Sequence, residues 1–244
     1  MAEHYGITKW EPPVKGFGGT PGGGTCADAV PTDPLFQAYT DIENFRNFPN
    51  VLISGEEVQI TEKIHGTNCR VGAINGELVA GSMRVQRVKP ANFETNTYWF
   101  PFTQTGVLDL VIHLAKEHAQ VLLYGEVFGS HIQNLHYGEV GTLGFRAFDL
   151  LVDGQYLDYD PFIDLCAEFA VATAPLLYAG PYSREVLLEC CKPKTTFEGA
   201  DHIMEGVVVK PTVERFDHKI GRVALKYITD EYLFSKTVTD SRDV

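Results

Sequence analysis

Lys63 lies in the run Glu62-Lys63-Ile64-His65-Gly66-Thr67-Asn68, whose residue types could carry covalent chemistry. Alternating apolar residues precede the lysine and a glycine follows it, so its amine is expected at the end of a strand, held on rigid backbone. A lysine attacks phosphorus or a carbonyl carbon only as the neutral amine, a form favoured by nearby cations, a metal ion or desolvation. Taken alone, the pattern also fits a surface lysine before a turn.

Four further motifs follow Lys63 in a fixed order. They are Gly125-Glu126-Val127-Phe128-Gly129, Phe145-Arg146-Ala147-Phe148-Asp149, Glu205-Gly206-Val207-Val208-Val209-Lys210 and Ala224-Leu225-Lys226-Tyr227. This order resembles the covalent nucleotidyltransferases, the superfamily of nucleic-acid ligases and mRNA capping enzymes. His65 and Asn68 are similar to the ATP-dependent RNA ligase branch that includes the phage double-strand RNA ligase and the trypanosome RNA-editing ligases. The resemblance spans residues 59–233.

The resemblance implies how ATP would be bound and attacked. Lys63 would be the nucleophile that takes AMP as a lysyl-AMP, and Glu62 would contact the adenine edge. Glu126, between two glycines, would accept from the ribose hydroxyls, and Phe148 would stack on adenine. An ordinary acid at a strand end and an aromatic packed in the core are the alternatives for Glu126 and Phe148.

Phosphate and metal binding fall to the last two motifs. The resemblance makes Glu205 a ligand of Mg²⁺, with Mn²⁺ as an alternative metal, and Lys210 and Lys226 phosphate contacts. Both lysines would also raise the local positive potential and keep Lys63 neutral. The family often has a second lysine near Lys226, and Arg222 is a candidate to supply the missing charge.

Sealing of nucleic-acid ends is assigned to residues close to the nucleophile. The resemblance implies that Asn68 engages the RNA ends and that His65 assists a step later than lysine adenylylation. Arg84 lies where the family places an arginine that contacts the 5′-phosphate side, with Arg87 as its rival. A turn histidine with satisfied hydrogen bonds is the alternative for His65.

Composition bounds the class of protein. The 244 residues suit one large domain, or a domain with a small appendage, and 44% hydrophobic residues support a sizeable core. No apolar run is long enough to span a bilayer, and the N-terminus does not resemble a signal peptide. Five cysteines without a C-x-x-C pair predict free thiols in a cytoplasmic, intracellular setting and argue against zinc. A phage-encoded source remains open.

The net charge of −12 is unusual for a protein that binds nucleic acid. Basic residues concentrate in the last quarter, where they could line one groove or be scattered over a solvated face: Lys192, Lys194, Lys210, Arg215, Lys219, Arg222 and Lys226. We therefore expect modest, salt-sensitive affinity and a substrate that holds its own ends together. A nicked duplex of RNA, or of RNA and DNA, is such a substrate. We expect the protein that binds it to be a monomer.

The elements predict an α+β fold with mostly antiparallel sheets. The resemblance implies that it is a nucleotidyltransferase domain, with antiparallel sheets flanked by helices. Residues 1–50 are expected to form a Gly/Pro-rich arm packed on the body, and residues 51–244 the catalytic domain without a C-terminal accessory domain. Asn75-Gly76 predicts a hairpin over residues 68–82. Helices are expected over residues 106–120, from the cap Asp160 onward, and from the cap Ser183 to Cys190, and short strands over residues 206–210 and 222–227.

Two other functions remain open on the sequence alone. The chain could be a self-adenylylating domain that needs a partner to seal ends, or a non-catalytic module that binds RNA ends. The intact set of Lys63, Glu126, Glu205, Lys210 and Lys226 argues against the second, because a binding module needs no nucleophile. A capping-type GTP transferase is disfavoured by His65.

Overall fold

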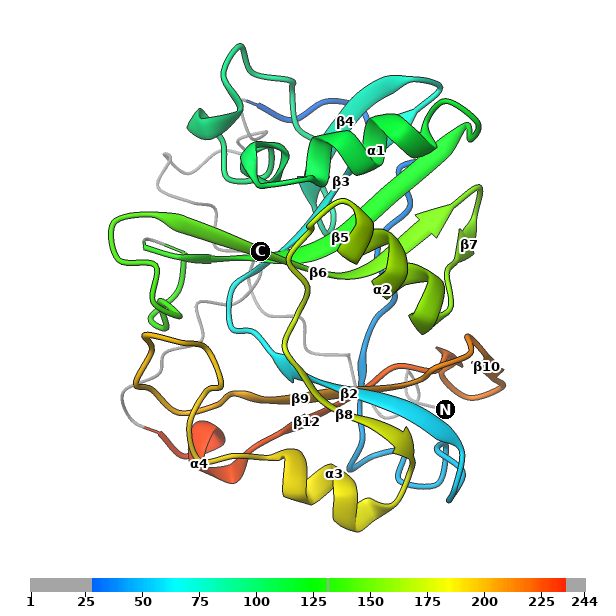
Figure 1. Ribbon diagram of the computed structural model, residues 1–244, viewed down its shortest axis with the longest axis vertical. Coiled ribbons are helices and arrows are strands. Elements are labelled where there is room, and N and C mark those ends of the chain that lie inside the picture. The colour runs from blue at the N-terminus through cyan, green and yellow to red at the C-terminus, as the bar shows by residue number, and fades with distance from the viewer. Residues whose placement is uncertain (1–27, 131, 236–244) are drawn as a thin grey trace, which may run out of the picture.

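The computed structural model describes residues 28–130 and 132–235, which build two five-stranded sheets (Figure 1). The first sheet has the order β1 (Glu43–Asn44), β12 (Leu225–Ile228), β9 (Gly206–Pro211), β2 (Glu57–Lys63) and β8 (Leu176–Pro181). The second has the order β4 (Glu77–Ser82), β3 (Thr67–Ile74), β5 (Gln120–Gly129), β6 (Leu143–Val152) and β7 (Gln155–Tyr156). Only β1 and β12 pair in parallel among the strands of these two sheets. The predicted α+β fold with antiparallel sheets is confirmed.

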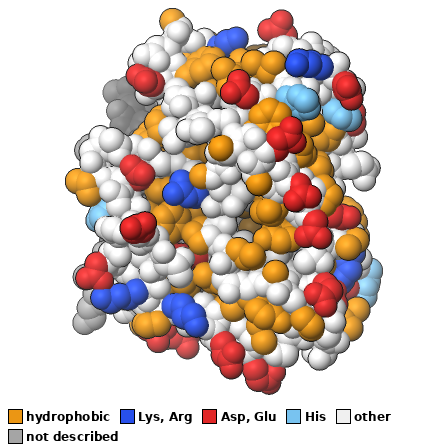
Figure 2. Space-filling model, in the orientation of Figure 1, with side chains coloured by type: hydrophobic (Ala, Val, Ile, Leu, Met, Phe, Trp, Pro, Cys, Tyr) orange, Lys and Arg blue, Asp and Glu red, His pale blue; other side chains and the backbone are white. Residues whose placement is uncertain are grey.

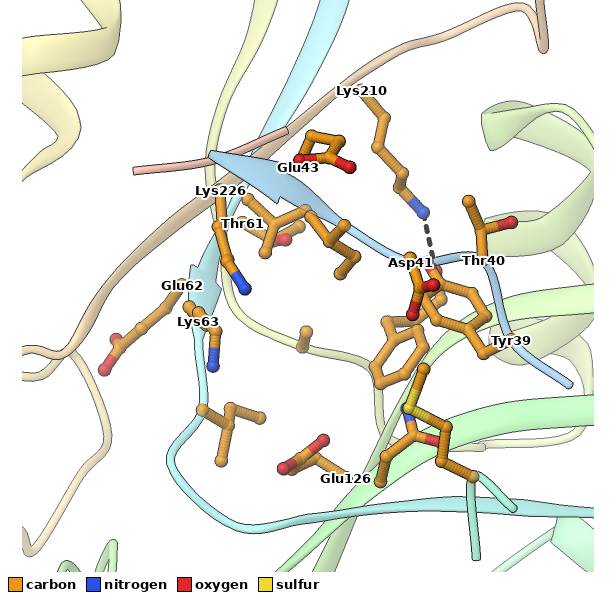
Figure 3. Close-up of a pocket in the computed structure, with 17 residues that line it drawn as sticks. Tyr39, Thr40, Asp41, Glu43, Thr61, Glu62, Lys63, Glu126, Lys210 and Lys226 are labelled. Atoms are coloured by element: carbon orange, nitrogen blue, oxygen red, sulfur yellow. Dashed lines mark hydrogen bonds between the residues drawn. The ribbon is translucent and has the colours of Figure 1, made fainter. Parts of the chain in front are cut away.

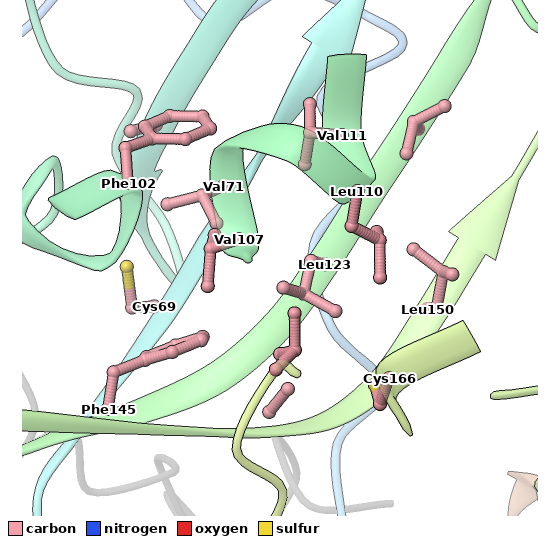
Figure 4. Packing of buried hydrophobic residues seen from close by; sticks show 14 of the residues in the cluster. Cys69, Val71, Phe102, Val107, Leu110, Val111, Leu123, Phe145, Leu150 and Cys166 are labelled. Atoms are coloured by element: carbon pink, nitrogen blue, oxygen red, sulfur yellow. The ribbon is translucent and has the colours of Figure 1, made fainter. Parts of the chain in front are cut away.

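Helices cover the outer face of each sheet. Helices α1 (Val107–Leu114) and α2 (Tyr159–Glu168) pack on the second sheet through a buried apolar cluster that includes Leu110, Leu123 and Phe162 (Figure 4). Helix α3 (Arg184–Cys190) packs on the first sheet, and α4 (Asp230–Leu233) follows β12 (Figure 1). Two short 3₁₀ helices, η2 (Phe93–Thr95) and η3 (Phe100–Thr103), precede α1, and β10 (Phe216–Asp217) pairs with β11 (Gly221–Arg222) in a small ribbon. With their outer faces covered, the sheets turn their other faces toward one another.

Strand periodicity decides which side chains reach the space between the sheets. Along β2, Val58 and Ile60 enter the core beneath α3, whereas Thr61 and Lys63 line the space between the sheets. Successive side chains of a strand point to opposite faces, so this alternation is built into the sequence. The same rule places Val208 and Lys226 on the side of Lys63, in one row with Thr61.

Several predicted boundaries hold and others move. Asn75 and Gly76 have φ angles of 50° and 81°, as the predicted hairpin turn requires, and Ser183 Oγ accepts from the Val186 amide to cap α3. The helix predicted over residues 106–120 ends at Leu114, because the chain must turn to start β5 at Gln120. Helix α2 starts at Tyr159, with Asp158 rather than Asp160 as its cap residue.

Residues 33–45, which we call the crossing segment, run from the second sheet to the first. The Tyr124 hydroxyl donates to the Gln37 carbonyl at 2.9 Å, and Arg70 donates to the Phe36 carbonyl, which ties the segment to β5 and β3. At its other end the Phe45 amide donates to the Lys226 carbonyl at 2.9 Å, and β1 joins the first sheet. The part of the predicted arm before residue 28 lies outside the described residues. Within the described residues, no helix is long and apolar enough to cross a bilayer.

Candidate functional site

A cavity of about 450 Å³ lies between the two sheets (Figure 3). Its volume falls in the range of roughly 300–1,000 Å³ that is typical of small-molecule sites. The first sheet contributes Thr61, Glu62, Lys63, Val208, Lys210 and Lys226, the second sheet and its loops contribute Asn68, Met83, Glu126 and Phe148, and the crossing segment and linking residues contribute Tyr39, Thr40, Asp41, Ile42, Glu43, Ile64 and Ala174. The cavity therefore gathers residues from all five sequence motifs.

Lys63 ends β2 with its amine in the cavity, where it meets Glu205. The Lys63 Nζ atom lies 2.7 Å from Glu205 Oε1, and the side chains are 25% and 7% exposed. Glu205 immediately precedes β9, whose Gly206 pairs with Lys63 across the sheet. Sheet register thus brings the predicted nucleophile and the predicted metal ligand together. In this arrangement the carboxylate favours the protonated amine, so Lys63 must part from Glu205 before it can attack.

His65 is buried behind this pair and is held at two points. Its backbone amide donates to the Tyr137 hydroxyl at 2.7 Å, and its Nδ1 atom shares a hydrogen bond of 2.9 Å with the Tyr232 hydroxyl. Glu205 Oε2 lies 4.0 Å from the same Nδ1 atom. Although Nδ1 lies near Glu205, His65 does not line the cavity.

The turn after Lys63 is pressed against β5, which is why it contains a glycine. A Cβ atom on Gly66 would lie 2.2 Å from the Val127 carbonyl oxygen and 2.8 Å from Glu126 Cγ. Just beyond this turn, Asn68 pairs with Glu126 across the sheet, and both side chains line the cavity. The predicted ribose contact and the predicted RNA-end contact are therefore neighbours.

An irregularity in β6 sets the position of Phe148. Tyr124 pairs with Asp149 and the next residue, Gly125, pairs with Ala147, which leaves Phe148 as the extra residue of a bulge. A bulge re-aims the side chains around it. Here it lets Phe148 line the cavity while its ring packs on Tyr39 at a centroid distance of 4.9 Å. Phe148 thus both faces the cavity and takes part in core packing.

Asp149, next to Phe148, is the centre of a buried ionic network. Its carboxylate accepts from the Lys210 amine at 2.6 Å, from two Arg222 nitrogens at 3.0 and 3.1 Å, and from the Tyr39 hydroxyl. Burial alone would raise the pKa of Asp149, but the charges of Lys210 and Arg222 bring it below its usual value. Burial raises the pKa of Tyr39, and the adjacent Asp149 raises it further. Arg222 is also bonded to Glu214 at 2.7 Å.

This network changes the role expected for Lys210. The resemblance implies a phosphate contact, but the Lys210 amine donates to Asp149 and to the Phe148 carbonyl at 2.9 Å. The side chain is 3% exposed, and Figure 3 shows its amine directed toward Tyr39, away from Lys63. Lys210 therefore joins the two sheets at the cavity wall. Arg222, the candidate for the missing charge, is buried in the same network.

Lys226 differs from Lys210 although both lie on the first sheet. Its half-buried side chain lines the cavity, and its amine points into the same space as that of Lys63 (Figure 3). Asp41 and Glu43 of the crossing segment also line this space, Glu43 from β1, the strand that pairs with the strand of Lys226 (Figure 3). Lys226 is thus the lysine placed to meet an anion beside Lys63.

Glu62 does not present its carboxylate to the cavity. Strand alternation turns the side chain to the other face of the sheet (Figure 3), where Thr195 and Thr196 donate to both carboxylate oxygens. The adenine-edge contact implied by the resemblance is therefore not available to this side chain as it is placed here. Sequence alone gave no signal for Thr195 and Thr196, which are far from Glu62 along the chain.

Neither arginine proposed for the 5′-phosphate lines the cavity. Arg84 is exposed, and its neighbour Met83 lines the cavity instead. Arg87 bonds Asp28 at 2.6 Å and lies over the Tyr98 ring at 5.0 Å. Both arginines follow the end of β4 at Ser82, and neither side chain reaches the cavity.

The cations of the last quarter do not form a groove. Lys210 and Arg222 are interior, Arg215 forms an ion pair with Glu56 at 2.8 Å, and Lys194 pairs with Asp201 on the surface. On the face drawn in Figure 2, basic side chains occur in separate spots between acidic ones. These residues neither line one groove nor share one solvated face, because two are buried and Lys226 lines the cavity.

Few protein ligands are available for a metal ion. In residues 28–130 and 132–235, no group of three or more His, Cys, Asp or Glu side chains is arranged to hold one, and the four cysteines of this part are free thiols. Mg²⁺ usually keeps several waters and binds one or two carboxylates together with substrate phosphates. Glu205 is buried and bonds the cavity-lining Lys63 at 2.7 Å, so its carboxylate fits such a site.

The crossing segment supplied the residues that sequence reasoning missed. Tyr39, Asp41 and Glu43 belong to a part of the chain predicted to be an arm, yet they form one wall of the cavity. The buried aromatic positions Phe36 and Tyr39 were the available signal, since an arm without a core would not need them.

Comparisons with known proteins identify a family and a shared fold. A model of the RNA ligase family matches residues 56–228. A mutant RNA ligase of Naegleria gruberi solved with ATP and manganese is similar in fold, with a TM-score of 0.68 and 23% identity over 95% of this chain and 66% of that chain. The same ligase with pyrophosphate gives a TM-score of 0.68, 23% identity, and 95% and 65% coverage. The chain thus spans about two thirds of that enzyme's length. No curated protein sequence matches.

Proposed function

The chain belongs to the RNA ligase family, and from this premise we propose that it is an ATP-dependent RNA ligase that joins a 3′-hydroxyl to a 5′-phosphate. The observation that carries the proposal is the Lys63 amine in a cavity of about 450 Å³, bonded to Glu205 at 2.7 Å and facing Lys226, Glu126 and Phe148. This cavity therefore holds a nucleophile, a cation for phosphate, an acceptor for the ribose hydroxyls and an aromatic ring for a base.

In the first step, the neutral Lys63 amine attacks the α-phosphorus of ATP. A nitrogen–phosphorus bond forms, the bond between the α-phosphorus and its bridging oxygen breaks, and pyrophosphate leaves. The proton lost by Lys63 passes to solvent, because the ion pair with Glu205 has opened before the attack. Lys226 offsets the negative charge that develops on the phosphates, an effect that is strong in a partly dehydrated site.

Three side chains would hold the nucleoside. Phe148 offers a ring that is already fixed by Tyr39, so stacking on adenine costs little ordering. Glu126 lines the cavity from β5 and can accept from the ribose hydroxyls. Asn68 lies directly across the sheet from Glu126 and is placed for the nucleic-acid end that arrives later.

Glu205 would hold Mg²⁺, or Mn²⁺, together with water and phosphate oxygens. When bound, the ion would supply positive charge to the departing pyrophosphate, and Glu205, once it holds the ion, would be less available to the Lys63 amine. The Naegleria ligase that shares this fold was solved with ATP and manganese, which supports the proposal.

In the later steps AMP moves from Lys63 to a 5′-phosphate, forming a phosphoanhydride. A 3′-hydroxyl then attacks the phosphorus of the former 5′-phosphate. The new phosphodiester bond forms, the bond from that phosphorus to the oxygen of AMP breaks, and AMP leaves. We assign Asn68 to the ends and His65 to this stage, as the resemblance to the RNA ligases implies; Asn68 lines the cavity, whereas His65 is buried outside it. A nicked duplex suits a surface without a basic groove, since base pairing holds both ends in place.

Intact mass after mixing with ATP or GTP and Mg²⁺ tests the proposal. The chain should gain one AMP from ATP, Lys63→Ala should gain none, and the exposed-lysine control Lys219→Ala should load normally. Loading from GTP instead would indicate a capping-type transferase. The absence of any covalent nucleotide would overturn the proposal and favour a binding module.

A second assay separates loading from sealing. Asn68→Ala should still accept AMP from ATP yet fail to seal a pre-adenylylated nicked RNA. If the unaltered chain loads AMP but seals no nick, it is a self-adenylylating domain that depends on a partner.

A further inference from the structure

We propose that Glu62 is a positioning residue, and that residues 195–202, which we call the clamp segment, hold the nucleophile-bearing turn from both sides. The proposal rests on the function proposed above, because it assigns Glu62 a part in lysine adenylylation. It also makes a structural claim that is testable without activity. The cavity faces Lys63, whereas the clamp lies on the opposite face of the same strand.

The first side of the clamp is the Glu62 carboxylate. The Thr195 hydroxyl donates to Oε1 at 2.5 Å, and the amide and hydroxyl of Thr196 donate to Oε2 at 2.8 and 2.5 Å. Glu62 is 1% exposed. A buried carboxylate that receives three donors from two adjacent residues fixes those residues firmly, because removing the donors would leave a buried charge without compensation.

The second side of the clamp holds the backbone of His65, two residues after Lys63, through Tyr137. The ring of Phe197 packs on Tyr137 at 4.7 Å, and the ring of His202 meets Tyr137 edge-on at 4.5 Å. The Tyr137 hydroxyl in turn accepts the backbone amide of His65 at 2.7 Å. Packing of the clamp segment on Tyr137 is thereby transmitted to the backbone of His65.

The clamp segment is itself closed into one unit. The Thr195 amide donates to the His202 carbonyl at 3.0 Å, and the Ala200 amide donates to the Phe197 carbonyl at 3.3 Å. The residue before Lys63 and a residue shortly after it are therefore tied to the two ends of one compact loop. Because Lys63 lies between these two ties, its backbone cannot shift without disturbing one of them.

This arrangement predicts a specific kinetic defect. Attack on phosphorus needs the amine in line with the leaving oxygen, and a displacement of about 1 Å costs roughly 10²-fold in rate. Loosening the clamp should lower the rate of the chemical step while leaving the nucleotide contacts intact. A Glu62 that contacted adenine would instead change the affinity for ATP and the preference between ATP and GTP.

The test is the double substitution Thr195→Val and Thr196→Val, which removes the hydroxyl donors at nearly constant volume. We expect the rate of Lys63 adenylylation at saturating ATP to fall about 10–100-fold, with the KM for ATP and the ATP-to-GTP preference little changed. Thr195→Ser with Thr196→Ser restores the hydroxyls and should restore the rate. The matched control is Thr212→Val, whose hydroxyl bonds the Glu57 carbonyl at the far end of the same strand.

Hydrogen exchange supplies a readout that does not depend on activity. The valine pair should speed exchange at the His65 amide and across the clamp segment, and Thr212→Val should not. Normal adenylylation and unchanged exchange in the valine pair would overturn the clamp. A higher KM for ATP with unchanged maximal rate would also overturn it and return Glu62 to the nucleotide.

Failure of the proposed function has a different signature. If the unaltered chain takes no AMP, the ligase proposal fails, but faster His65 exchange in the valine pair still supports the clamp as the structural hold on this turn. If the chain loads AMP normally and the valine pair behaves like the control in both measurements, only the clamp fails.

Discussion

Lys63 and Lys210 lie on adjacent strands and each bonds a carboxylate, yet their surroundings differ. The Lys63 side chain is 25% exposed and bonds Glu205 at the edge of the cavity. Lys210 is 3% exposed and bonds Asp149, which also binds Arg222 and Tyr39. The first pair can be opened by an incoming ligand, whereas the second is enclosed by partners on every side.

This difference in exposure suits the Lys63–Glu205 pair to the reaction and the Lys210–Asp149 pair to holding the fold together. A partly exposed pair can exchange its partner for phosphate or metal at modest cost, but a buried charge that loses its partner remains uncompensated. Asp149 belongs to the second sheet and Lys210 to the first. Their bond therefore fixes the spacing of the two walls between which Lys63 acts.

The largest effect should come from replacing Lys63, the partly exposed lysine of this comparison. Lys63→Ala should abolish adenylylation, a loss of at least about 10³-fold, because a nucleophile has no substitute. Lys63→Arg should fail as well, since guanidinium stays protonated. Thermal unfolding of both variants should remain close to that of the unaltered chain, and intact mass with ATP measures the loading.

Lys210→Met supplies the other half of the comparison. It should lower the unfolding temperature, while the folded fraction still loads AMP at a rate within about tenfold of normal. Loss of loading as complete as in Lys63→Ala, with stability unchanged, would show that Lys210 contacts phosphate after all.

Asp149→Ala should cost about 3–5 kcal/mol in the free energy of unfolding, because it leaves Lys210 and Arg222 buried without their shared anion. Urea titration measures the loss. Asp201→Ala is the matched control, since it breaks the surface pair with Lys194, whose side chains are 65% and 81% exposed. That change should leave the free energy of unfolding almost unchanged, because solvent screens an exposed pair. Equal effects would mean that the Asp149 network is not a structural centre.

Lys226 should show an intermediate effect on chemistry. Lys226→Ala should slow adenylylation about 10–10²-fold by removing a cation beside the phosphates, and Lys226→Arg should retain much of the rate. Single-turnover loading with ATP provides the measurement. If the alanine variant loads AMP at the normal rate, Lys226 is not the cation that offsets the phosphate charge.

The smallest expected effect is a pH dependence of stability. The folded-state pKa of Asp149 lies below its usual value, so the network contributes stability above about pH 4, the unfolded value. Below that pH the unfolded chain binds more protons than the folded chain, and the contribution is lost as the pH falls through the folded pKa. The gap in unfolding temperature between the unaltered chain and Asp149→Asn should therefore narrow in acid. A constant gap down to pH 2 would argue against an ionised Asp149.

The sequence alone determined the strands that carry the chemistry and the order of the motifs. Residue alternation placed Lys63 at the end of a strand, and Asn75-Gly76 specified a hairpin. These are local properties, because backbone geometry repeats every two residues and turn geometry depends on adjacent residues.

Only the tertiary structure decided which side chains face the cavity. Glu62 and Lys210 belong to recognised motifs, yet the pleat and long-range partners direct one to Thr195 and Thr196 and the other to Asp149. Tyr39 reached the cavity through a segment that looked like an arm. Such partners are distant along the chain, and no local pattern specifies them, because they depend on how two separately formed sheets are packed together.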